Sequence, residues 1–364
     1  MTFDDVLIIK NGKNQRAVEN PDGKYPIYGS GGIMGYADDY ICEADTVIVG
    51  RKGSINNPIF VEEPFWNVDT AFGLVAKREV LLPRYLYYFC RNYDFERLNK
   101  AVTIPSLTKS DLLKIEITLP SLEIQEKIVN KLLKIEEVIQ ARQQQLQKMD
   151  ELVKARFIEL FGDPATNPYG WQQLTVNDVC VSVVRGPFGS ALKKEFFVPP
   201  SDTTYKVYEQ KHAIQKSSTI GTYYVTAEKY NELRRFGCHS GDILMSCSGT
   251  MGELYQLPAG CERGIINQAL CKFTLNERIL PIVFLAYMRE TIGNLETKGS
   301  GIQNIAAVSY VKAMPISLPP MRVQEQYATF VEQTDKSKLA IQQSLDKLKT
   351  LRKSLMQEYY GQGE

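Results

Sequence analysis

The chain has 364 residues, 44% hydrophobic and 23% charged, which is the composition of a folded globular protein and excludes a disordered one. It has no run of 18 apolar residues and no basic, apolar leader, so we expect no membrane span, no secretory signal and a cytoplasmic location. Its 43 basic and 42 acidic side chains nearly cancel, which argues against a protein that holds nucleic acid by charge alone.

The first third of the chain alternates short β-prone runs with turn clusters. Residues 6–9, 46–49 and 72–76 are predicted strands, bounded by turns such as Gly-Ser-Gly-Gly and Arg-Lys-Gly-Ser. A helix is predicted over Pro83–Asn92, with proline in its first turn. The segment 165–319 has a similar alternation of β-prone runs and turn clusters, so we expect two globular parts.

A long helix with a heptad pattern occurs twice, displaced by 199 residues. The copies open Leu119-Pro120-Ser121-Leu122-Glu123-Ile124-Gln125-Glu126 and Leu318-Pro319-Pro320-Met321-Arg322-Val323-Gln324-Glu325, and each runs about 40 residues, or ~60 Å, to a glycine, Gly162 or Gly361. The seam of the first is interrupted at Arg142 and Arg156 and ends at Leu160. The second keeps the 4-3 spacing through Tyr327, Thr334, Lys338, Arg352 and Tyr359. The apolar residues predicted to pack between the helices are Ile128, Leu132, Ile135, Ile139, Leu146, Met149, Val153, Val331, Ile341, Leu345, Leu348 and Leu355.

Two apolar stripes of this length favour each other, because either alone would lie in water. The first helix must deliver the chain to the second globule and the second must run back, so we expect antiparallel pairing. The predicted fold class is α+β, with two duplicated mixed α/β domains joined by two long helices in an antiparallel coiled coil, arranged with pseudo-twofold symmetry.

Short strings in the two globules match in order. Ala44-Asp45 matches Gly241-Asp242, Gly53 matches Gly249, Asp69-Thr70-Ala71 matches Asn267-Gln268-Ala269, and Leu82-Pro83 matches Leu280-Pro281. Residues 10–40 show no counterpart in residues 183–240. A common frame with divergent loops is typical of two modules that read different ligands.

The sequence offers no catalytic or metal-binding constellation. Seven cysteines without a Cys-x-x-Cys pair indicate buried free thiols and no metal site. There is no phosphate-binding loop, and His212 and His239 belong to no nucleophile signature. Asn167-Pro168-Tyr169 lacks a proline of the methyltransferase motif Asn-Pro-Pro-Tyr and follows a helix end, so we interpret it as a linker.

Together these strings resemble the specificity (S) subunit of type I restriction–modification systems over the whole chain. The repeated Leu-Pro-x-x-x-x-Gln-Glu motif carries the resemblance, with the similar segments Ile104-Pro105-Ser106-Leu107-Thr108-Lys109-Ser110-Asp111-Leu112 and Gly301-Ile302-Gln303-Asn304-Ile305. Residues 23–32 and 185–190 are similar to recognition-domain signatures. The resemblance divides the chain into target-recognition domains at 1–119 and 164–319 and conserved helical regions at 120–163 and 320–364.

One departure concerns the start of the first domain. The second domain begins at Trp171, whereas the first begins near the equivalent of Asp178, at Asp5. We expect either that the first domain lacks a small edge strand or that its start lies further upstream.

The resemblance implies a DNA-reading subunit without a catalytic centre, which binds a bipartite double-stranded DNA target with one recognition domain per half-site. Two modification subunits would bind S-adenosylmethionine and methylate adenine, and two restriction subunits would bind ATP and Mg²⁺, translocate DNA and cut it. This chain would bind no cofactor and no membrane, and the helix pair would set the spacing between the half-sites.

Base reading requires donors and acceptors on loops that enter a groove, and basic residues that hold phosphates. The DNA-binding candidates of the first domain are Lys13, Tyr28, Gly29, Ser30, Gly31, Arg51 and Lys52. Those of the second domain are Arg185, Phe188, Ser190, Lys193, Lys194, Lys211, Arg234, Arg235, Ser248, Gln303 and Asn304. Each lysine or arginine has the alternative of a solvated surface charge, and Tyr28 and Phe188 have the alternative of core packing.

Two alternative functions have different requirements. A coiled-coil adaptor whose globules bind proteins is favoured by the near-neutral charge, and salt-dependent DNA binding would separate it from the first hypothesis. A self-sufficient methyltransferase or nuclease lacks every motif that its chemistry requires.

Overall fold

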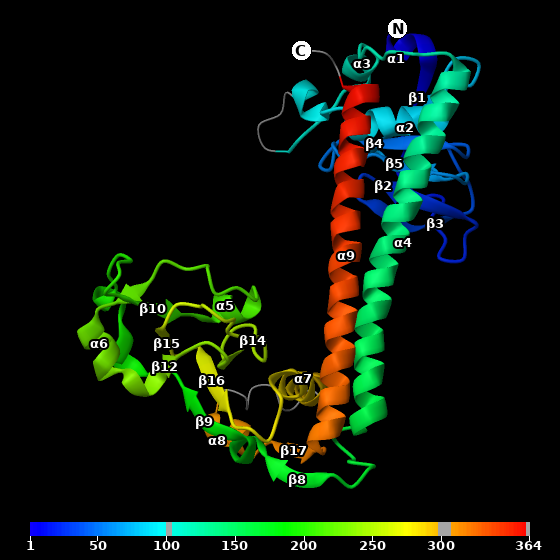
Figure 1. Ribbon diagram of the computed structural model, residues 1–364. Coiled ribbons are helices and arrows are strands. Elements are labelled where there is room, and N and C mark those ends of the chain that lie inside the picture. The colour runs from blue at the N-terminus through cyan, green and yellow to red at the C-terminus, as the bar shows by residue number, and fades with distance from the viewer. Residues whose placement is uncertain (100–103, 298–306, 362–364) are drawn as a thin grey trace. The chain divides into compact units, whose positions relative to one another are not determined.

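The structure is a computed structural model that describes residues 1–99, 104–297 and 307–361 (Figure 1). The chain divides into two compact units: unit 1 comprises Met1–Gln145 and Ala340–Glu364, and unit 2 comprises Leu146–Leu339. Each unit therefore contains a globular part and segments of both long helices.

The two long helices have the predicted ends. Helix α4 (Leu122–Phe161) and helix α9 (Met321–Tyr360) contain 40 residues each. They end directly before Gly162 and Gly361. At Gly162 the backbone has φ +78°, a left-handed conformation that glycine adopts without strain and that ends a helix.

The globular part of unit 1 contains two sheets, with strand orders β1-β7-β4-β5 and β3-β2-β6. The strands are β1 (Leu7–Asn11), β2 (Tyr25–Gly29), β3 (Gly32–Ala37), β4 (Thr46–Gly50), β5 (Ile59–Val61), β6 (Trp66–Asn67) and β7 (Ala71–Ala76). The helices are α1 (Phe3–Val6), α2 (Pro83–Asn92) and α3 (Lys109–Leu112), with a 3-10 helix at Phe95–Leu98.

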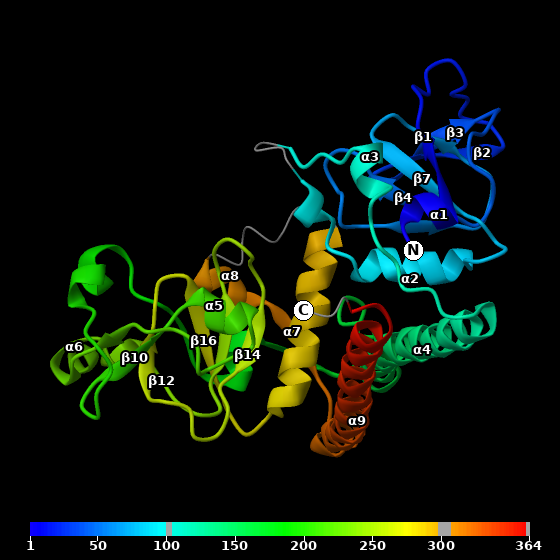
Figure 2. The same cartoon turned by 90° about the horizontal axis from the view of Figure 1, so that it is seen from above.

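Helix α2 has the predicted bounds and joins the first sheet of unit 1 to the long helices. All residues of β4 are buried, and α2 packs on β4, β5 and β7. On its other side, the Tyr88 hydroxyl donates to Glu136 of α4 at 2.8 Å, and the Tyr85 ring lies 4.9 Å from that of Tyr360 in α9. Figure 2 shows α2 between the strands and α4.

The globular part of unit 2 contains sheets of order β14-β13-β16-β9 and β11-β10-β15-β12, and the pair β17-β8. The strands are β8 (Gln172–Thr175), β9 (Cys180–Arg185), β10 (Tyr205–Tyr208), β11 (Tyr224–Val225), β12 (Gly237–Cys238), β13 (Ile243–Ser246), β14 (Leu254–Gln256), β15 (Gly264–Ile266), β16 (Leu270–Leu275) and β17 (Pro315–Leu318). The helices are α5 (Gln210–Ile214), α6 (Ala227–Glu232), α7 (Pro281–Thr297) and α8 (Val308–Ala313), with 3-10 helices at Val176–Val179, Gly189–Leu192, Lys194–Phe196 and Arg234–Phe236.

Helix α7 begins at Pro281, as the match with Pro83 predicts, and takes the place that α2 has in unit 1. Its Phe284 ring lies 5.2 Å from Phe273 of β16, and its Tyr287 ring lies 5.9 Å from Phe157 of α4. The largest core cluster of unit 2 accordingly includes residues from the sheet, from α7 and from both long helices.

The two units share one topology. In unit 1, β2 pairs antiparallel with β3 and parallel with β6, and in unit 2, β10 pairs antiparallel with β11 and parallel with β15. Strands β2 and β3 therefore do have counterparts within residues 183–240, so the sequence interpretation of residues 10–40 was wrong. The equivalence was hidden because the segment between β10 and β13 is longer than the segment between β2 and β4, so the offset is 180 at β10 and 196 at β13.

Two of the matched strings are shifted by one residue. The strand register makes Asp45 equivalent to Gly241, both with positive φ, at 59° and 89°. The hydrogen bonds of the turns make Val68 equivalent to Asn267, so that Asp69 corresponds to Gln268. The sequence strings were matched by residue type, whereas the structural equivalence follows the backbone conformation of the turns, and the two differ by one residue.

Helices α4 and α9 pair antiparallel within each unit. In unit 1 the Lys131 ammonium donates to the Tyr359 hydroxyl at 3.0 Å. In unit 2 Lys338 forms an ion pair with Asp150, and the Phe161 ring lies 5.2 Å from that of Tyr327. The beginning of each helix therefore meets the end of the other.

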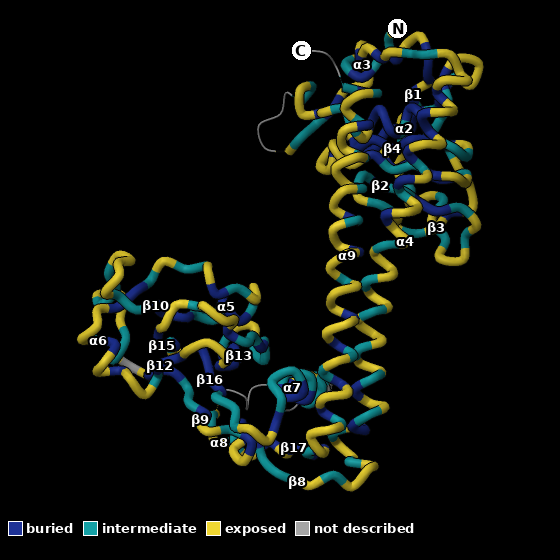
Figure 3. Tube along the Cα trace, viewed as in Figure 1, coloured by how far each residue is buried: buried dark blue, intermediate teal, exposed yellow. Residues whose placement is uncertain are grey.

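Every residue of the predicted packing seam is buried or half-buried, and Figure 3 shows the remaining helix faces exposed. The buried ones are Ile128, Leu132, Ile135, Ile139, Val331, Ile341, Leu345 and Leu355, and the half-buried ones are Leu146, Met149, Val153 and Leu348. At the end of α4 the seam departs from the prediction, because Phe157 and Phe161 are buried while Arg156 and Leu160 are half-buried. Likewise Tyr360, and not Tyr359, is the buried residue at the end of α9. These aromatic rings pack against the globular parts, so the buried face at the end of each helix is shifted by one residue from the predicted seam.

The edge strand differs between the units as the sequence predicts. In unit 2, β8 pairs with β17 over four residues, from Thr175 opposite Pro315 to Gln172 opposite Leu318. In unit 1, the corresponding contact within the described residues is a single bridge between Thr2 and Glu116.

Candidate nucleic-acid interface

In unit 1, the turn at residues 68–70, between β6 and β7, is the meeting point of three loops that carry predicted DNA-binding residues. The Lys13 amide donates to the carbonyl just before the turn at 2.8 Å, and the Tyr28 carbonyl accepts the first amide of the turn at 3.0 Å. The amides of Arg51 and Lys52 donate to the last carbonyl of the turn at 2.8 and 3.2 Å. Lys13, Arg51 and Lys52 have exposed side chains around one turn.

The segment Gly29-Ser30-Gly31 lies beside the loop that follows β4. A Cβ atom on Gly50 would lie 3.1 Å from that of Ser30, and one on Gly53 would lie 3.9 Å from the Ser30 hydroxyl. Gly53 has φ +80°, which favours glycine. Gly29 is buried, Ser30 is half-buried and Gly31 is exposed.

The string that begins at Ile104 is placed at the same loop. The Gly53 amide donates to the carbonyl of Pro105 at 3.0 Å, and the Leu107 amide donates to the carbonyl of Arg51 at 2.9 Å. The predicted motif therefore fixes the backbone of the arginine loop.

Unit 2 builds the same junction around the turn at residues 267–269. The Asn267 amide donates to the carbonyl of Tyr208 at 2.9 Å, and the Cys247 amide donates to the carbonyl of Ala269 at 2.8 Å. Gly186 follows β9, as Gly12 follows β1. A Cβ atom on Gly186 would lie 1.9 Å from the Asn267 carbonyl oxygen, and one on Gly12 would lie 1.8 Å from the matching oxygen of unit 1, so both positions require glycine.

Arg51 and Arg185 reach equivalent turn carbonyls from different strands. The Arg51 guanidinium, after β4, donates to Asp69 O at 3.5 Å and lies 5.8 Å from the Phe72 ring centre. The Arg185 guanidinium, at the end of β9, donates to Gln268 O at 3.2 Å and lies 5.0 Å from the exposed Phe188 ring. Arg185 also donates to the Cys247 carbonyl at 3.4 Å. Each unit therefore places an arginine guanidinium at the equivalent carbonyl of this turn.

A second group of predicted residues gathers near α5 of unit 2. The Ser248 hydroxyl donates to the Gln210 side chain at 3.0 Å. The Lys211 ammonium forms an ion pair with Glu209 at 2.7 Å and lies 5.4 Å from the Tyr223 ring centre. These bonds connect the loop after β13 to α5, an insertion that unit 1 lacks among its described residues.

The other predicted residues of unit 2 lie on surface segments. Lys193 forms a 3.6 Å ion pair with Glu195, and the 3-10 helix Arg234–Phe236 packs on β9 and β15. The side chains of Ser190, Lys193, Lys194, Arg234 and Arg235 are exposed. Gln303 and Asn304 lie outside the described residues.

The two predicted aromatic residues differ in burial. Phe188 is 65% exposed, whereas Tyr28 is half-buried and its ring lies edge-on to that of Phe65 at 5.4 Å. Burial, with the nearby charge of Glu63, raises the pKa of Tyr28 above its ordinary value. Its hydroxyl is therefore a neutral donor at neutral pH.

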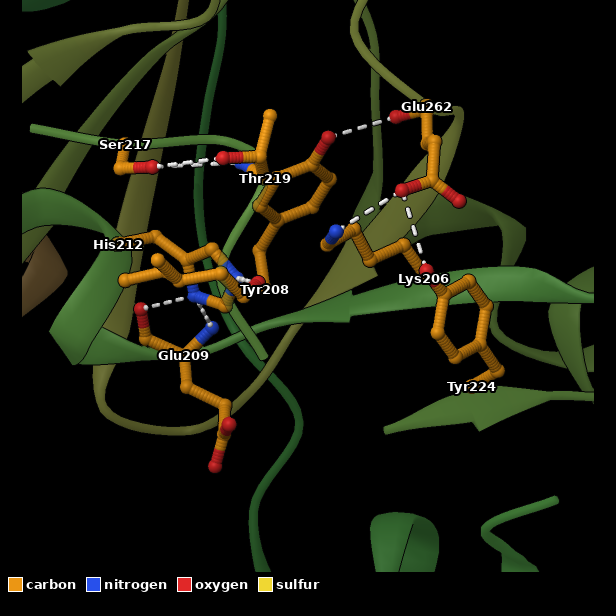
Figure 4. Close-up of polar contacts among 9 residues, drawn as sticks. Lys206, Tyr208, Glu209, His212, Ser217, Thr219, Tyr224 and Glu262 are labelled. Carbon is orange, nitrogen blue, oxygen red and sulfur yellow. Dashed lines mark hydrogen bonds and ion pairs between the residues drawn. The ribbon is translucent and has the colours of Figure 1, made fainter. Parts of the chain in front are cut away.

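Beside the unit 2 turn, the second sheet holds an ion pair between a buried lysine and an exposed glutamate, which the sequence did not indicate. Figure 4 shows the Lys206 ammonium and the Tyr224 hydroxyl converging on the Glu262 carboxylate, at 2.9 and 3.1 Å. Lys206 is 1% exposed, and the Tyr208 hydroxyl donates to the Glu262 carbonyl at 2.7 Å. Burial opposes ionisation of Glu262, but the bonds from Lys206 and Tyr224 outweigh it and lower its pKa. This cluster holds β10, β11 and the loop before β15 together.

His212 fixes the α5 insertion in the same region. The Glu209 amide donates to Nδ1 at 2.9 Å, and the neutral ring donates from Nε2 to the Ile220 carbonyl at 2.7 Å (Figure 4). Burial lowers the pKa of His212, which favours the neutral ring. Its role is to position the loop.

Asp69 and Gln268 are the residues of the junctions that sequence analysis did not choose. Both are exposed at the tips of the equivalent turns. The matching strings around them were a signal, but they were interpreted as part of the common frame.

The described residues contain no helix long and apolar enough to cross a bilayer. In the same part of the chain, no three His, Cys, Asp or Glu side chains are grouped as metal ligands. All seven cysteines are free thiols. Cys180 and Cys261 are only half-buried, so the expectation that all are buried was wrong for these two.

The chain thus combines a duplicated mixed α/β domain with two paired long helices. Residues 1–150 and 168–350 match the family described as the type I restriction modification DNA specificity domain. The chain belongs to this family.

The chain is similar to individual members. It is 24% identical over 360 residues to a Haemophilus influenzae protein named as a type I restriction enzyme specificity subunit, covering 92% of this chain and 88% of that protein. It is 27% identical over 142 residues to a Mycoplasma pneumoniae protein named as a type I specificity subunit, covering 37% of this chain and 46% of that relative, which is about half its length.

Two solved structures share the fold. One is the S subunit of a type I restriction–modification system from M. genitalium, with TM-score 0.58, 17% identity and coverage of 100% of this chain and 96% of that one. The other comes from a study of complex assembly and conformational transition in the type I system, with TM-score 0.67, 15% identity and coverage of 99% and 96%.

Proposed function

We propose that this chain is the non-catalytic subunit that reads a bipartite DNA target, with one recognition domain, at 1–119 or 164–319, for each half-site. The observation that carries the proposal is the junction built twice. The same backbone frame supports an arginine at the same turn carbonyl, while the exposed side chains around the two turns differ. Such a frame suits two readers with different preferences.

The helical regions at 120–163 and 320–364, with adjoining loops, would dock two modification subunits and, through the assembled complex, two restriction subunits. S-adenosylmethionine, ATP and Mg²⁺ would bind to those partners. Phosphate contacts of the partners would supplement the weak charge of this chain, because its 14 basic and 16 acidic residues at 1–119 give little net attraction for DNA.

The alternative is a coiled-coil adaptor with protein ligands, which the near-neutral charge favours. The two are separated by measuring retention of duplex DNA by the full chain, alone and with its modification subunit, between about 50 and 200 mM salt. The DNA-reading proposal predicts binding that weakens steeply with salt in at least one of these preparations. Absence of DNA binding in both would overturn it and leave the adaptor.

A further inference from the structure

The tips of the two equivalent turns carry different polar side chains on the same backbone. Asp69 in unit 1 and Gln268 in unit 2 are both exposed, and the carbonyl of each accepts from an arginine side chain. The difference between the two junctions is therefore concentrated at one structural position.

Several hydrogen bonds hold the backbone of each turn. In unit 1 the Ala71 amide closes the turn by donating to Val68 O at 3.0 Å, and Thr70 O accepts the Arg51 amide. In unit 2 the Leu270 amide donates to Asn267 O at 3.1 Å, and the Asn267 side chain accepts the Ala269 amide at 3.1 Å. These hydrogen bonds fix the backbone conformation of both turns.

In the part of the chain that the structure describes, the side chains at the tips of the two turns have no internal partner. Within residues 1–99, 104–297 and 307–361, no hydrogen bond or ion pair engages the carboxylate of Asp69 or the side-chain amide of Gln268. A polar group held on a fixed backbone and left without an internal partner is pre-organised to bind a ligand edge.

The chemistry of the two groups differs in a way that DNA bases distinguish. A carboxylate is an acceptor only, and beside a phosphate backbone it costs free energy unless it accepts from an exocyclic amino group such as cytosine N4. An amide donates and accepts, and matches N6 and N7 of adenine in the major groove.

We infer that Asp69 and Gln268 are specificity-determining residues, one for each half-site, with Asp69 selecting a base that offers an amino donor and Gln268 selecting adenine. This inference rests on the proposed DNA-reading function and deepens it. The arginine beside each residue offsets phosphate repulsion and holds the turn, and the free side chain discriminates between bases.

The test is selection of duplexes from a randomised pool by the full chain in complex with its modification subunit. Asp69→Asn should change the preferred base at one position of one half-site, and Gln268→Glu should change one position of the other half-site. Each change should alter preference between bases by about 5- to 150-fold, the range of a good base contact, with the opposite half-site unchanged.

Matched controls exchange the same groups elsewhere. Glu79→Gln in unit 1 and Asn177→Asp in unit 2 alter exposed residues outside the junctions and the long helices, and should leave both half-sites unchanged. Thermal unfolding of all four variants verifies that they are folded.

Three outcomes are distinguishable. If Asp69→Asn and Gln268→Glu select the same sequence as the unsubstituted chain, the assignment is overturned while the proposed function stands. A loss of affinity with unchanged base preference also overturns it, because that result indicates a supporting role only. If the unsubstituted chain selects no sequence, the proposed function fails and the assignment fails with it.

Discussion

The side chains of Gln125 and Gln324 form the same three hydrogen bonds, one set in each unit. Gln125 Nε2 donates to the carbonyls of Val80 and Pro120 at 2.8 and 2.9 Å, and its Oε1 accepts the Leu82 amide at 2.9 Å. Gln324 Nε2 donates to the carbonyls of residues 278 and 319 at 3.0 Å each, and its Oε1 accepts the amide of residue 280 at 2.9 Å. The glutamine of the repeated motif therefore ties the start of each long helix to the loop before α2 or α7.

Removing this amide should destabilise unit 1. Gln125 is fully buried, and Gln125→Met leaves the Leu82 amide and the Val80 carbonyl without partners. We expect a loss of about 2 to 4 kcal/mol in the free energy of unfolding, measured by urea denaturation. Gln143→Met, an exposed position on the same helix, is the control and should change the free energy by less than about 0.5 kcal/mol. Equal effects of the two substitutions would contradict this account of the motif.

The helix seam should be sensitive at buried positions only. Leu345 is 3% exposed and Leu351 is 47% exposed, both on the unit 1 part of α9. Leu345→Ala should cost about 2 to 5 kcal/mol, because it removes apolar contacts and leaves a cavity. Leu351→Ala should cost well under half as much, and the comparison is made by thermal unfolding of the full chain. A larger effect at Leu351 would show that the helices pack through another face.

The stability of unit 2 should decrease as pH falls below about 6.5. Burial holds the pKa of His212 below the 6.5 of an unfolded histidine, so the unfolded chain binds a proton first. The stabilisation is complete above pH 6.5 and is lost progressively as pH falls toward the lower pKa of the folded state. Thermal unfolding between pH 8 and 5.5 measures it.

His212→Gln is the matched variant, because glutamine keeps a polar side chain but does not titrate. It should unfold with a weaker pH dependence across this window, whereas its difference from the unsubstituted chain at pH 8 reports only the substitution itself. An unchanged slope would mean that other groups cause the pH dependence.

Much of the frame could be predicted from the sequence, because it depends on local and periodic signals. The ends of α4 and α9 follow from a glycine after a long uninterrupted heptad pattern, and α2 follows from a proline at its first turn. Strands β2 and β10 share the pattern Tyr-x-Ile/Val-Tyr, in Tyr-Pro-Ile-Tyr and Tyr-Lys-Val-Tyr. Their equivalence was not predicted, because their displacement of 180 residues differs from the 196 to 199 residues of the matched strings.

The site was predictable in part. Lys13, Ser30 and Arg51 are predicted loop donors. The structure brings the loops of Lys13 and Arg51 together at one turn and places Ser30 beside the loop of Arg51. Asp69 was not chosen, since an acidic residue is an unusual candidate for a DNA-facing surface and its place at the junction depends on long-range backbone bonds. The sequence also does not predict that Arg51 and Arg185 contact equivalent turn carbonyls, because Arg51 follows β4 whereas Arg185 ends β9, and these strands are not equivalent.

The spacing between the half-sites is expected to depend on helix length. Glu136 faces Arg352 at 3.8 Å in unit 1, and Asp150 faces Lys338 in unit 2, so residues 139–145 of α4 correspond to residues 343–349 of α9. Duplicating both of these heptads keeps the seam in phase and lengthens each helix by about 10 Å. The DNA selected by this variant should keep both half-site sequences and have a longer unread spacer. Duplicating only one of the two is the control and should disrupt pairing; an unchanged spacer in the double variant would disprove the dependence on helix length.

The central claim, that one chain reads two separate half-sites, is tested most directly by mapping methylated adenines across the genome in cells with and without this gene. The account predicts a set of methylated sites that disappears without the gene and shares two defined blocks of bases separated by a spacer of constant length and undefined sequence. A single continuous block, or a methylation pattern that does not depend on the gene, would contradict it.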